Sequence, residues 1–356
     1  MKPIKEAAAP IYFGETAYAI LTDYCLKQSF SAIVILVDVN TAQACLPYFL
    51  SHMEFAQEPL VITVPAGEEH KAMSTCMTVI EQLSSAHLDR KGLMINLGGG
   101  VITDMGGFIA SIYKRGMQYV NVPTTLLAMV DASVGGKTGV DLGALKNQIG
   151  VINNGGMVIV DPHYLKTLIQ RELNSGMAEV IKHGLISNPD YWQQIVQTNP
   201  NNIEELEALI HESVVFKNKI VSADPNEQGI RKILNYGHTL GHAIETYCLE
   251  QHDKPTLLHG EAIIIGLILE TYISVQRFGF PKEALNALCN YVKPYYPAVS
   301  FSTKDIDHIE QLMVYDKKNV GGQINFVLLS TIGTHKLNIQ VSSELIAEAF
   351  DYYQAL

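Results

Sequence analysis

Five short apolar runs in the first half of the chain constrain its fold more than any other feature. They are rich in Val, Ile and Leu, and an Asp, Pro or Gly follows each of them, at residues 31–37, 60–64, 92–97, 117–122 and 157–160. Continuous apolar runs of this length are typical of strands buried on both faces, as in parallel sheets covered by helices. Residues 72–87 read as an amphipathic helix between two of these runs. The pattern predicts an α/β domain with a parallel sheet.

The second half has a different pattern, in which long helical periods dominate. The predicted helices cover residues 172–187, 203–221, 230–248, 260–278, 281–291 and 342–353. One run, residues 323–329, reads as a strand. We therefore predict a boundary near residue 168, with an α/β domain over 1–168 and a mainly α-helical domain over 169–356.

The length and net charge of the chain limit which kinds of molecule it can bind. A chain of 356 residues can form two domains with a substantial core. Its net charge of −11 argues against binding to nucleic acid or to an anionic membrane, because both need basic surfaces. A small anionic substrate is still compatible with this charge if lysines cluster locally.

The cysteines and the N-terminal sequence indicate a cytoplasmic protein. The five cysteines are scattered and form no CxxC pair, which is typical of reduced thiols. The first residues lack the apolar core of a signal peptide, and no run reaches the roughly 18 apolar residues of a membrane span.

Three histidines in the second half are candidate metal ligands. His238 and His242 are four residues apart in a helical pattern, so both imidazoles can lie on one helical face. His259 opens the next helix-length run, and Gly237, Gly241 and Gly260 flank the three. Imidazole nitrogen is a ligand that zinc prefers. Packing or capping is the alternative interpretation, and we favour a functional site.

A carboxylate that could complete the metal site lies on the predicted helix over 172–187. Glu179 is a candidate partner for the histidines, and His183, four residues later, is a rival ligand by the same helical spacing. Alternatively, Glu179 and Lys182 form only a surface ion pair, which contributes a few tenths of a kcal/mol.

Polar residues follow several of the predicted strands. The sequence GGGVITD, residues 98–104, joins a strand to a helix, where free N–H groups suit a pyrophosphate. Asp38 and Asn40 could bind ribose, and Glu68 and Lys71 come from the same edge of the sheet, where ligands gather. The GGGVITD sequence is not the usual dinucleotide fingerprint, so an ordinary tight turn is equally compatible with it.

The segment over residues 122–141 is apolar but dense in small and polar groups. It contains Thr124, Thr125, Asp131 and Lys137, and Lys146 and Asn147 follow shortly after it. SVGGKTG is not a P-loop, because the glycine required before the four intervening residues is absent. A solvated lysine loop is the alternative interpretation of Lys137 and Lys146.

Taken in order, seven motifs resemble the 3-dehydroquinate synthase family of sugar phosphate cyclases. The resemblance extends from about residue 33 to 333 and is carried by GGGVITDMGGFIA, YKRG, VPTTLLAMVDASVGGKTGVD, KNQIG, RELNSGMAEVIKHGLI, RKILNYGHTLGHAIE and LHGEA. The chain departs from the family at Lys114 and Asp141, where methionine and asparagine are usual. Neither position carries known chemistry.

The resemblance implies a Rossmann-like NAD-binding α/β domain, followed by a helical domain that binds Zn²⁺ or Co²⁺. It implies Glu179, His238 and His259 as metal ligands, and it leaves His242 to hydrogen-bond the substrate. The implied NAD contacts are Asp38, Asn40, Glu68, Lys71, Gly99, Gly100, Asp104, Thr124, Thr125, Lys146 and Thr167. The implied substrate pocket contains Arg115, Asp131, Lys137, Lys146, Asn147, Lys182, Lys217, Arg231, Asn235 and one of Lys317 or Lys318. In the homodimer that the family implies, Arg115 would reach the neighbouring subunit's site.

The implied reaction converts 3-deoxy-D-arabino-heptulosonate 7-phosphate to 3-dehydroquinate and phosphate, in the shikimate pathway of aromatic amino acid and chorismate biosynthesis. NAD takes hydride from C5, phosphate leaves by β-elimination, the hydride returns, and the opened ring closes by an aldol step. Related cyclases that make 2-deoxy-scyllo-inosose or epi-valiolone are the nearest alternative. A metal-dependent polyol dehydrogenase, which would release NADH, and a non-catalytic NAD-binding module are further alternatives.

Overall fold

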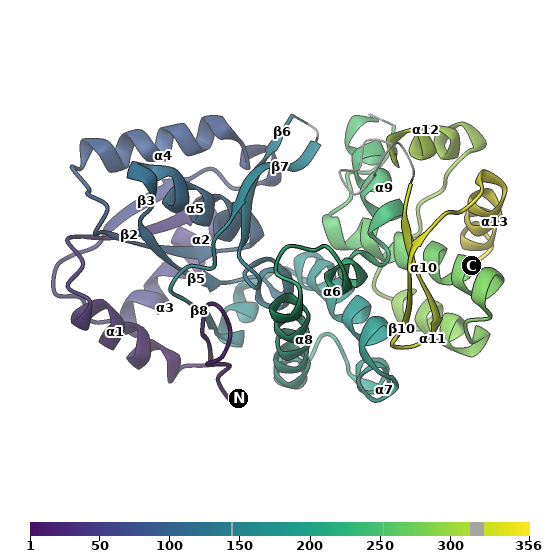
Figure 1. Cartoon of the computed structure of the whole chain (residues 1–356), viewed down its shortest axis with the longest axis horizontal. Coiled ribbons are helices and arrows are strands. Elements are labelled where there is room, and N and C mark those ends of the chain that lie inside the picture. Colours follow the sequence, from purple (N-terminus) through teal and green to yellow (C-terminus); the bar gives the residue numbers. More distant parts are fainter. Residues whose placement is uncertain (144, 252, 314–323) are drawn as a thin grey trace. The chain divides into compact units, whose positions relative to one another are not determined.

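The computed structural model describes residues 1–143, 145–251, 253–313 and 324–356. Within these residues the chain forms two compact units (Figure 1). The first contains residues 1–169 and 206–218, and the second contains residues 170–205 and 219–356. Residues 206–218 pack with the first unit, which the sequence pattern does not indicate. The domain division at residue 168 stays a prediction.

The first unit is built on a six-stranded parallel sheet with the order β1-β8-β5-β4-β2-β3. The prediction of a parallel α/β sheet is confirmed, and all five predicted strands are present. The strands are β1 (Ile11–Phe13), β2 (Ile33–Asp38), β3 (Leu60–Val64), β4 (Leu93–Gly98), β5 (Gln118–Pro123) and β8 (Met157–Val160). The sequence missed β1, because three residues are too few to show a period.

Helices cover the sheet, and a hairpin extends from it. Side chains of α4 (Met73–Ser85) and α5 (Gly100–Ile112) form one apolar core with β2, β3 and β4. The other helices are α1 (Ala17–Lys27), α2 (Val39–Ala44) and α3 (Leu46–Ser51), with short turns η1 (Glu68–His70), η2 (Tyr113–Arg115), η3 (Ala128–Ala132) and η4 (Pro162–Thr167). The antiparallel pair β6 (Lys137–Leu142) and β7 (Leu145–Ile152) contains Lys137 and Lys146, for which a solvated loop is the alternative interpretation of the sequence.

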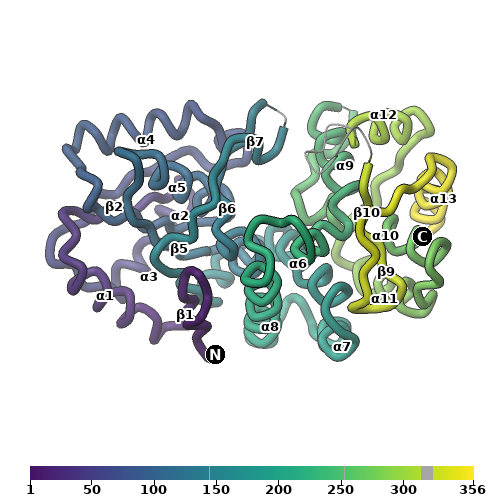
Figure 2. Tube along the Cα trace, viewed as in Figure 1, coloured from purple at the N-terminus to yellow at the C-terminus, as the bar shows by residue number. Residues whose placement is uncertain are grey.

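The second unit is mainly helical, as predicted, and Figure 2 traces its chain from α9 to the C-terminus. Its apolar core is formed by α9, α10, α12, α13 and β9. The elements are α6 (Gln170–Ser187), α7 (Pro189–Gln197), η5 (Ile230–Asn235), α9 (His238–Glu250), α10 (His259–Phe278), α11 (Lys282–Val292), α12 (Thr303–Met313), β9 (Phe326–Thr331), β10 (Thr334–Ile339) and α13 (Ser343–Gln354). Helix α8 (Ile203–Ala223) contributes residues to both units.

The predicted single helix over residues 230–248 is wrong. The chain forms the 3₁₀ turn η5 and then starts α9 at His238, because Gly237 between them has a φ of +79°. That left-handed conformation ends a helix and strongly favours glycine. The consequence is that His238 lies on the first turn of a new helix.

None of the helices in the described ranges is long and apolar enough to cross a membrane.

Helices α9 and α10 are in close contact at Gly266 of α10, so substitution of this glycine tests their packing. A Cβ at Gly266 would lie 2.0 Å from the Gly237 carbonyl oxygen. We expect Gly266→Ala to lower the free energy of unfolding by about 2 kcal/mol, because overpacking costs about 3 kcal/mol and alanine regains about 1 kcal/mol in a helix. Urea denaturation measures the change.

Gly229→Ala is the matched control, because the nearest atom to its added Cβ would be Asp224 Oδ2 at 3.6 Å. Its stability should match that of the wild type. Equal stability of the Gly266→Ala chain would contradict the close packing.

Candidate functional site

The three predicted metal ligands lie together in the second unit. Glu179 is on α6, His238 begins α9 and His259 begins α10. The Nε2 atoms of His238 and His259 lie 3.3 Å and 3.6 Å from the same oxygen, Glu179 Oε1. Three side chains from three helices therefore converge on one point.

Hydrogen bonds at Nδ1 set the orientation of both imidazoles. His238 Nδ1 lies 3.0 Å from the Tyr236 carbonyl oxygen, and His259 Nδ1 lies 2.9 Å from Glu245 Oε2. Because both partners are acceptors, each Nδ1 carries a proton, and whenever a ring is neutral its Nε2 atom presents a lone pair. Lone pairs facing a carboxylate oxygen repel it unless a cation or a proton lies between them. The donor set thus fits a cation.

Burial and neighbouring charges set the protonation of this group. Burial, helped by Lys182, lowers the pKa of His238 to about 3, so the ring is neutral at physiological pH. Burial also lowers the pKa of His259, but Glu245 and Glu179 outweigh it and raise the pKa to about 10. Burial raises the pKa of Glu179, yet Lys182 and His238 hold that pKa well below its usual range. A metal bound by His259 must therefore displace one proton.

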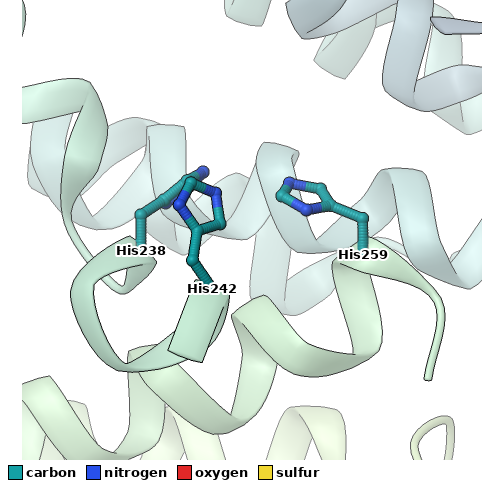
Figure 3. A group of neighbouring side chains, drawn as sticks. All are labelled: His238, His242 and His259. Carbon is teal, nitrogen blue, oxygen red and sulfur yellow. The ribbon is translucent and has the colours of Figure 1, made fainter. Parts of the chain in front are cut away.

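His242 lies beside the same group. The ring centroids of His238 and His242 are 5.1 Å apart, which confirms that the two residues share a helical face. One ring nitrogen from each of His238, His242 and His259 lies within 4.8 Å of the other two. Figure 3 shows the three rings, two from α9 and one from α10, turned into the same space. Geometry offers both Glu179 and His242 as the third ligand, so the set with Glu179 stays a prediction.

Buried glutamates hold the two helix starts in place. Glu270 of α10 accepts hydrogen bonds from the backbone N–H groups of Gly237, Thr239 and Leu240, and so caps α9. Glu261 accepts from the Leu258 N–H, at 2.7 Å, and from the Arg171 guanidinium. The sequence reasoning missed these residues. Glu245 and Glu261 lie within the motifs RKILNYGHTLGHAIE and LHGEA, so the sequence could have suggested them. No local sequence pattern points to Glu270.

Close helix packing completes the frame. A Cβ on Gly260 would lie 1.9 Å from the Ser175 carbonyl oxygen of α6, and one on Gly241 would lie 2.8 Å from Ile263 Cδ1 of α10. Gly241 and Gly260, which flank the histidines in the sequence, thus allow the helices to approach closely. His183, the rival ligand on α6, is fully buried.

In the first unit, the predicted cofactor residues lie at the carboxyl edge of the sheet. The strand order runs from β2 outward to β3 on one side and to β4, β5 and β8 on the other, so its switch point lies between β2 and β4. Ligands of open α/β sheets bind at such a point. Asp38 ends β2 there, and Gly99 is the N-cap of α5, without a side-chain hydrogen bond to the helix.

Hydrogen bonds and close packing position the residues around the switch point between β2 and β4. Asp38 Oδ1 accepts the N–H groups of Asn40 and Thr41, each at 2.8 Å, so Asp38 caps α2. Thr124 donates its N–H to the Gly98 carbonyl oxygen at 2.9 Å. A Cβ on Gly99 would lie 3.0 Å from the Thr125 methyl group, which brings both threonines beside the glycine turn. Thr167 is exposed at the end of η4.

Lys71 is the centre of a polar network in the first unit. Its buried ammonium donates to Asp104 Oδ2 at 2.7 Å and to Asn147 Oδ1 at 2.6 Å. Lys146 lies 2.9 Å from Glu68 Oε1. Burial lowers the pKa of Lys71, but Asp104 and Glu68 outweigh it and raise that pKa above its ordinary value. Four predicted cofactor residues and one predicted substrate residue are thus brought together.

The other predicted substrate residues lie in separate places within each unit. In the first unit, Lys217 Nζ lies 2.8 Å from Asp131 Oδ1, whereas Lys137 and Arg115 are exposed. In the second unit, the buried Arg231 donates to the Pro225 carbonyl oxygen at 2.7 Å, Asn235 donates to Glu227 at 2.8 Å, and Lys182 contacts Glu179. Lys317 and Lys318 lie outside the described residues.

Comparison with known families decides the family. Residues 61–175 match the family model described as 3-dehydroquinate synthase N-terminal, and residues 176–319 match the one described as 3-dehydroquinate synthase C-terminal. A 3-dehydroquinate synthase of Parabacteroides distasonis is 41% identical over 336 residues, which are 94% of each chain. The chain belongs to the 3-dehydroquinate synthase family.

Solved structures of related cyclases share the fold of this 3-dehydroquinate synthase family member. A 2-epi-5-epi-valiolone synthase from Streptomyces hygroscopicus, with NAD⁺ and Zn²⁺ bound, matches with a TM-score of 0.84 and 24% identity over 100% of this chain and 99% of its own. A 2-deoxy-scyllo-inosose synthase complexed with carbaglucose-6-phosphate, NAD⁺ and Co²⁺ has a TM-score of 0.84 and 25% identity over 98% of both chains. The predicted fold class and family are confirmed.

The buried Lys71–Asp104 pair gives a test of the network in the first unit. We expect Lys71→Met to lower the free energy of unfolding by about 3 kcal/mol, because it leaves a largely buried carboxylate without its cation. The double variant Lys71→Met/Asp104→Asn should lose less than the sum of the two single losses. Urea denaturation of the three variants measures this coupling.

The matched control is Lys27→Met, which breaks the exposed Lys27–Asp23 pair at 2.9 Å. Its effect should be too small to resolve. Additive single losses at Lys71 and Asp104 would show that the two residues stabilise the unit independently.

Proposed function

We propose that this chain converts 3-deoxy-D-arabino-heptulosonate 7-phosphate to 3-dehydroquinate and phosphate, with NAD and a divalent metal as cofactors. The observation that carries the proposal is the convergence of His238 and His259 on Glu179, in a chain 41% identical to a 3-dehydroquinate synthase. The enzyme is then a phosphate-eliminating carbon–oxygen lyase of the shikimate pathway.

Glu179, His238 and His259 would hold the metal. Within the described chain, Glu179 Oε1 is buried and has no hydrogen-bond partner, although two imidazole nitrogens face it. Two imidazoles and a carboxylate are a ligand set that suits zinc and also cobalt, and the related cyclases bind Zn²⁺ or Co²⁺. Once bound, the metal would lower the pKa of the substrate hydroxyl that is oxidised.

The carboxyl edge of the sheet would hold NAD. The first N–H groups of α5, behind Gly99 and Gly100, would bind the pyrophosphate, because a helix N-terminus attracts anions. Asp38 uses one oxygen to cap α2 and would accept a ribose hydroxyl with the other. NAD supplies the hydride acceptor and returns the hydride within one turnover. The remaining proposed contacts are Asn40, Glu68, Lys71, Asp104, Thr124, Thr125, Lys146 and Thr167.

The substrate carries a carboxylate and a phosphate, and cations would bind both. Because the chain has a net charge of −11, a group of cations around the substrate would be a local feature and not a property of the whole chain. Their share of catalysis is positioning and electrostatic stabilisation. The proposed substrate contacts are Arg115, Asp131, Lys137, Lys146, Asn147, Lys182, Lys217, Arg231 and Asn235, with His242 beside the phosphate or the reacting hydroxyl.

We also propose a cytoplasmic homodimer in which Arg115 reaches the neighbouring subunit's site, without nucleic-acid or membrane partners. The five cysteines are buried free thiols, which is compatible with a reducing compartment. Arg115 is exposed and has a positive φ of +69°. A backbone held in that region at a non-glycine residue is often a functional feature.

Another sugar phosphate cyclase activity is the second candidate, because the similar solved structures include such enzymes. Their identity to this chain is 24–25%, against 41% for the Parabacteroides synthase. The sugar phosphate substrates of these two enzymes, each assayed beside the heptulosonate phosphate, would identify the substrate.

Phosphate release tests the proposed reaction. We expect the chain to release phosphate from the heptulosonate phosphate in the presence of NAD, without net formation of NADH. A chelator should abolish the release, and added Zn²⁺ or Co²⁺ should restore it. Steady accumulation of NADH with simple polyols would instead identify a dehydrogenase.

Lys137 tests the proposed substrate contacts. We expect Lys137→Ala to lower kcat by on the order of 10²–10³-fold, as the loss of one electrostatic contact to the transition state does. NAD affinity, measured by calorimetry, should stay nearly unchanged. The exposed Lys91 provides the control, because Lys91→Ala should keep the wild-type kcat. A Lys137→Ala chain with unchanged kcat would remove Lys137 from the site.

A further inference from the structure

We propose that Glu245 is a positioning residue for the metal, which keeps Nε2 of His259 directed at the point where Glu179 Oε1 lies. This role rests on the proposed function, because it requires a metal at Glu179, His238 and His259. Glu245 is on α9 and is 8% exposed. Its Oε2 atom accepts the Nδ1 proton of His259 at 2.9 Å, and Glu245 is not among the proposed metal, NAD or substrate contacts.

The position of Glu245 follows from helical spacing. His238, His242 and Glu245 occupy positions i, i+4 and i+7 of α9, so they share one helical face. That face presents two imidazoles and one carboxylate to the start of α10. The Glu245 carboxylate is thus placed to contact His259, the histidine of the group that belongs to α10.

His259 depends on a side chain for its orientation, whereas His238 does not. The Nδ1 atom of His238 donates to the backbone carbonyl oxygen of Tyr236, which no substitution removes. Each histidine is the first residue of its helix, so neither ring is restricted by a preceding helical turn, and the difference lies in the Nδ1 acceptor. Among the contacts of the described chain, the Glu245 carboxylate is the acceptor that fixes the Nδ1 proton of His259.

Without that acceptor, the ring can carry its proton on either nitrogen. A proton on Nε2 blocks the lone pair that must bind the metal, and rotation of the ring moves Nε2 away from Glu179. Glu245 also adds a second negative charge beside a dication, whereas Lys182 contacts Glu179 and offsets part of its charge. Removal of Glu245 should therefore weaken metal binding through orientation and through charge.

Two substitutions separate these effects. Glu245→Gln retains an oxygen that can accept the Nδ1 proton but removes the charge, whereas Glu245→Ala removes both. The matched control is Glu250→Gln, which removes one charge from an exposed position at the end of the same helix. Each chain is stripped of metal, checked for folding by its melting temperature, and titrated with Zn²⁺ against a chromogenic chelator. The absorption spectrum of the Co²⁺-loaded chain reports the ligand geometry.

We expect Glu245→Ala to weaken Zn²⁺ binding by about 10–100-fold and to change the Co²⁺ spectrum, as loss of a carboxylate that orients a ligating histidine does. Glu245→Gln should weaken binding by about tenfold and keep the spectrum, and Glu250→Gln should bind within twofold of the wild type. If Glu245→Ala does not fold, the Zn²⁺ affinity of Glu245→Gln decides whether Glu245 has this role.

Unchanged Zn²⁺ affinity of the folded Glu245 variants, in a wild-type chain that binds Zn²⁺, would overturn this role alone. An equal loss in Glu250→Gln would overturn it as well, because the effect would then come from net charge. A wild-type chain that binds neither Zn²⁺ nor Co²⁺ would overturn the proposed metal site and this role together.

Discussion

The close contact between α9 and α10 is the constraint on which the candidate metal site depends. A Cβ at Gly266 would meet the Gly237 carbonyl oxygen, so the two helices can be this close only because glycine occupies that position. Gly237 also adopts the left-handed conformation that starts α9 at His238. One local arrangement therefore brings His238 and His259 together and fixes the direction of the helix that carries His242.

The same contact explains why charged groups are buried around it. A helix that starts inside a core exposes its first N–H groups to an apolar environment, and unsatisfied groups there are costly. Glu270, which is fully buried, accepts three of them. A carboxylate replaces the water that would cap the helix at a surface, so the start of α9 can lie in the interior. The face of α9 that carries His238 and His242 thus keeps a defined position.

Much of the fold could be predicted from local sequence, but the site could be predicted only in part. Continuous apolar runs located five strands, and the spacing of His238 and His242 correctly placed both on one face. The break at Gly237 was missed because the apolar period continues through it, and only the contact with α10 shows why the chain turns there. Glu270 lies 30 or more residues along the chain from the N–H groups that it accepts, so no local pattern indicates it. The choice of Glu179 over His183 came from the family resemblance.

The buried lysines show how an acidic chain holds positive charge in its interior. Three of the buried lysines contact a carboxylate within their own unit, in the pairs Lys71–Asp104, Lys217–Asp131 and Lys182–Glu179. A buried ammonium without a partner would cost several kcal/mol, so these contacts stabilise the chain before any ligand binds. A phosphate or carboxylate that binds such a lysine replaces the carboxylate that already contacts it. The net gain in binding free energy from charge alone is therefore small. We therefore expect anion selectivity at each of these lysines to depend on geometry rather than on charge alone.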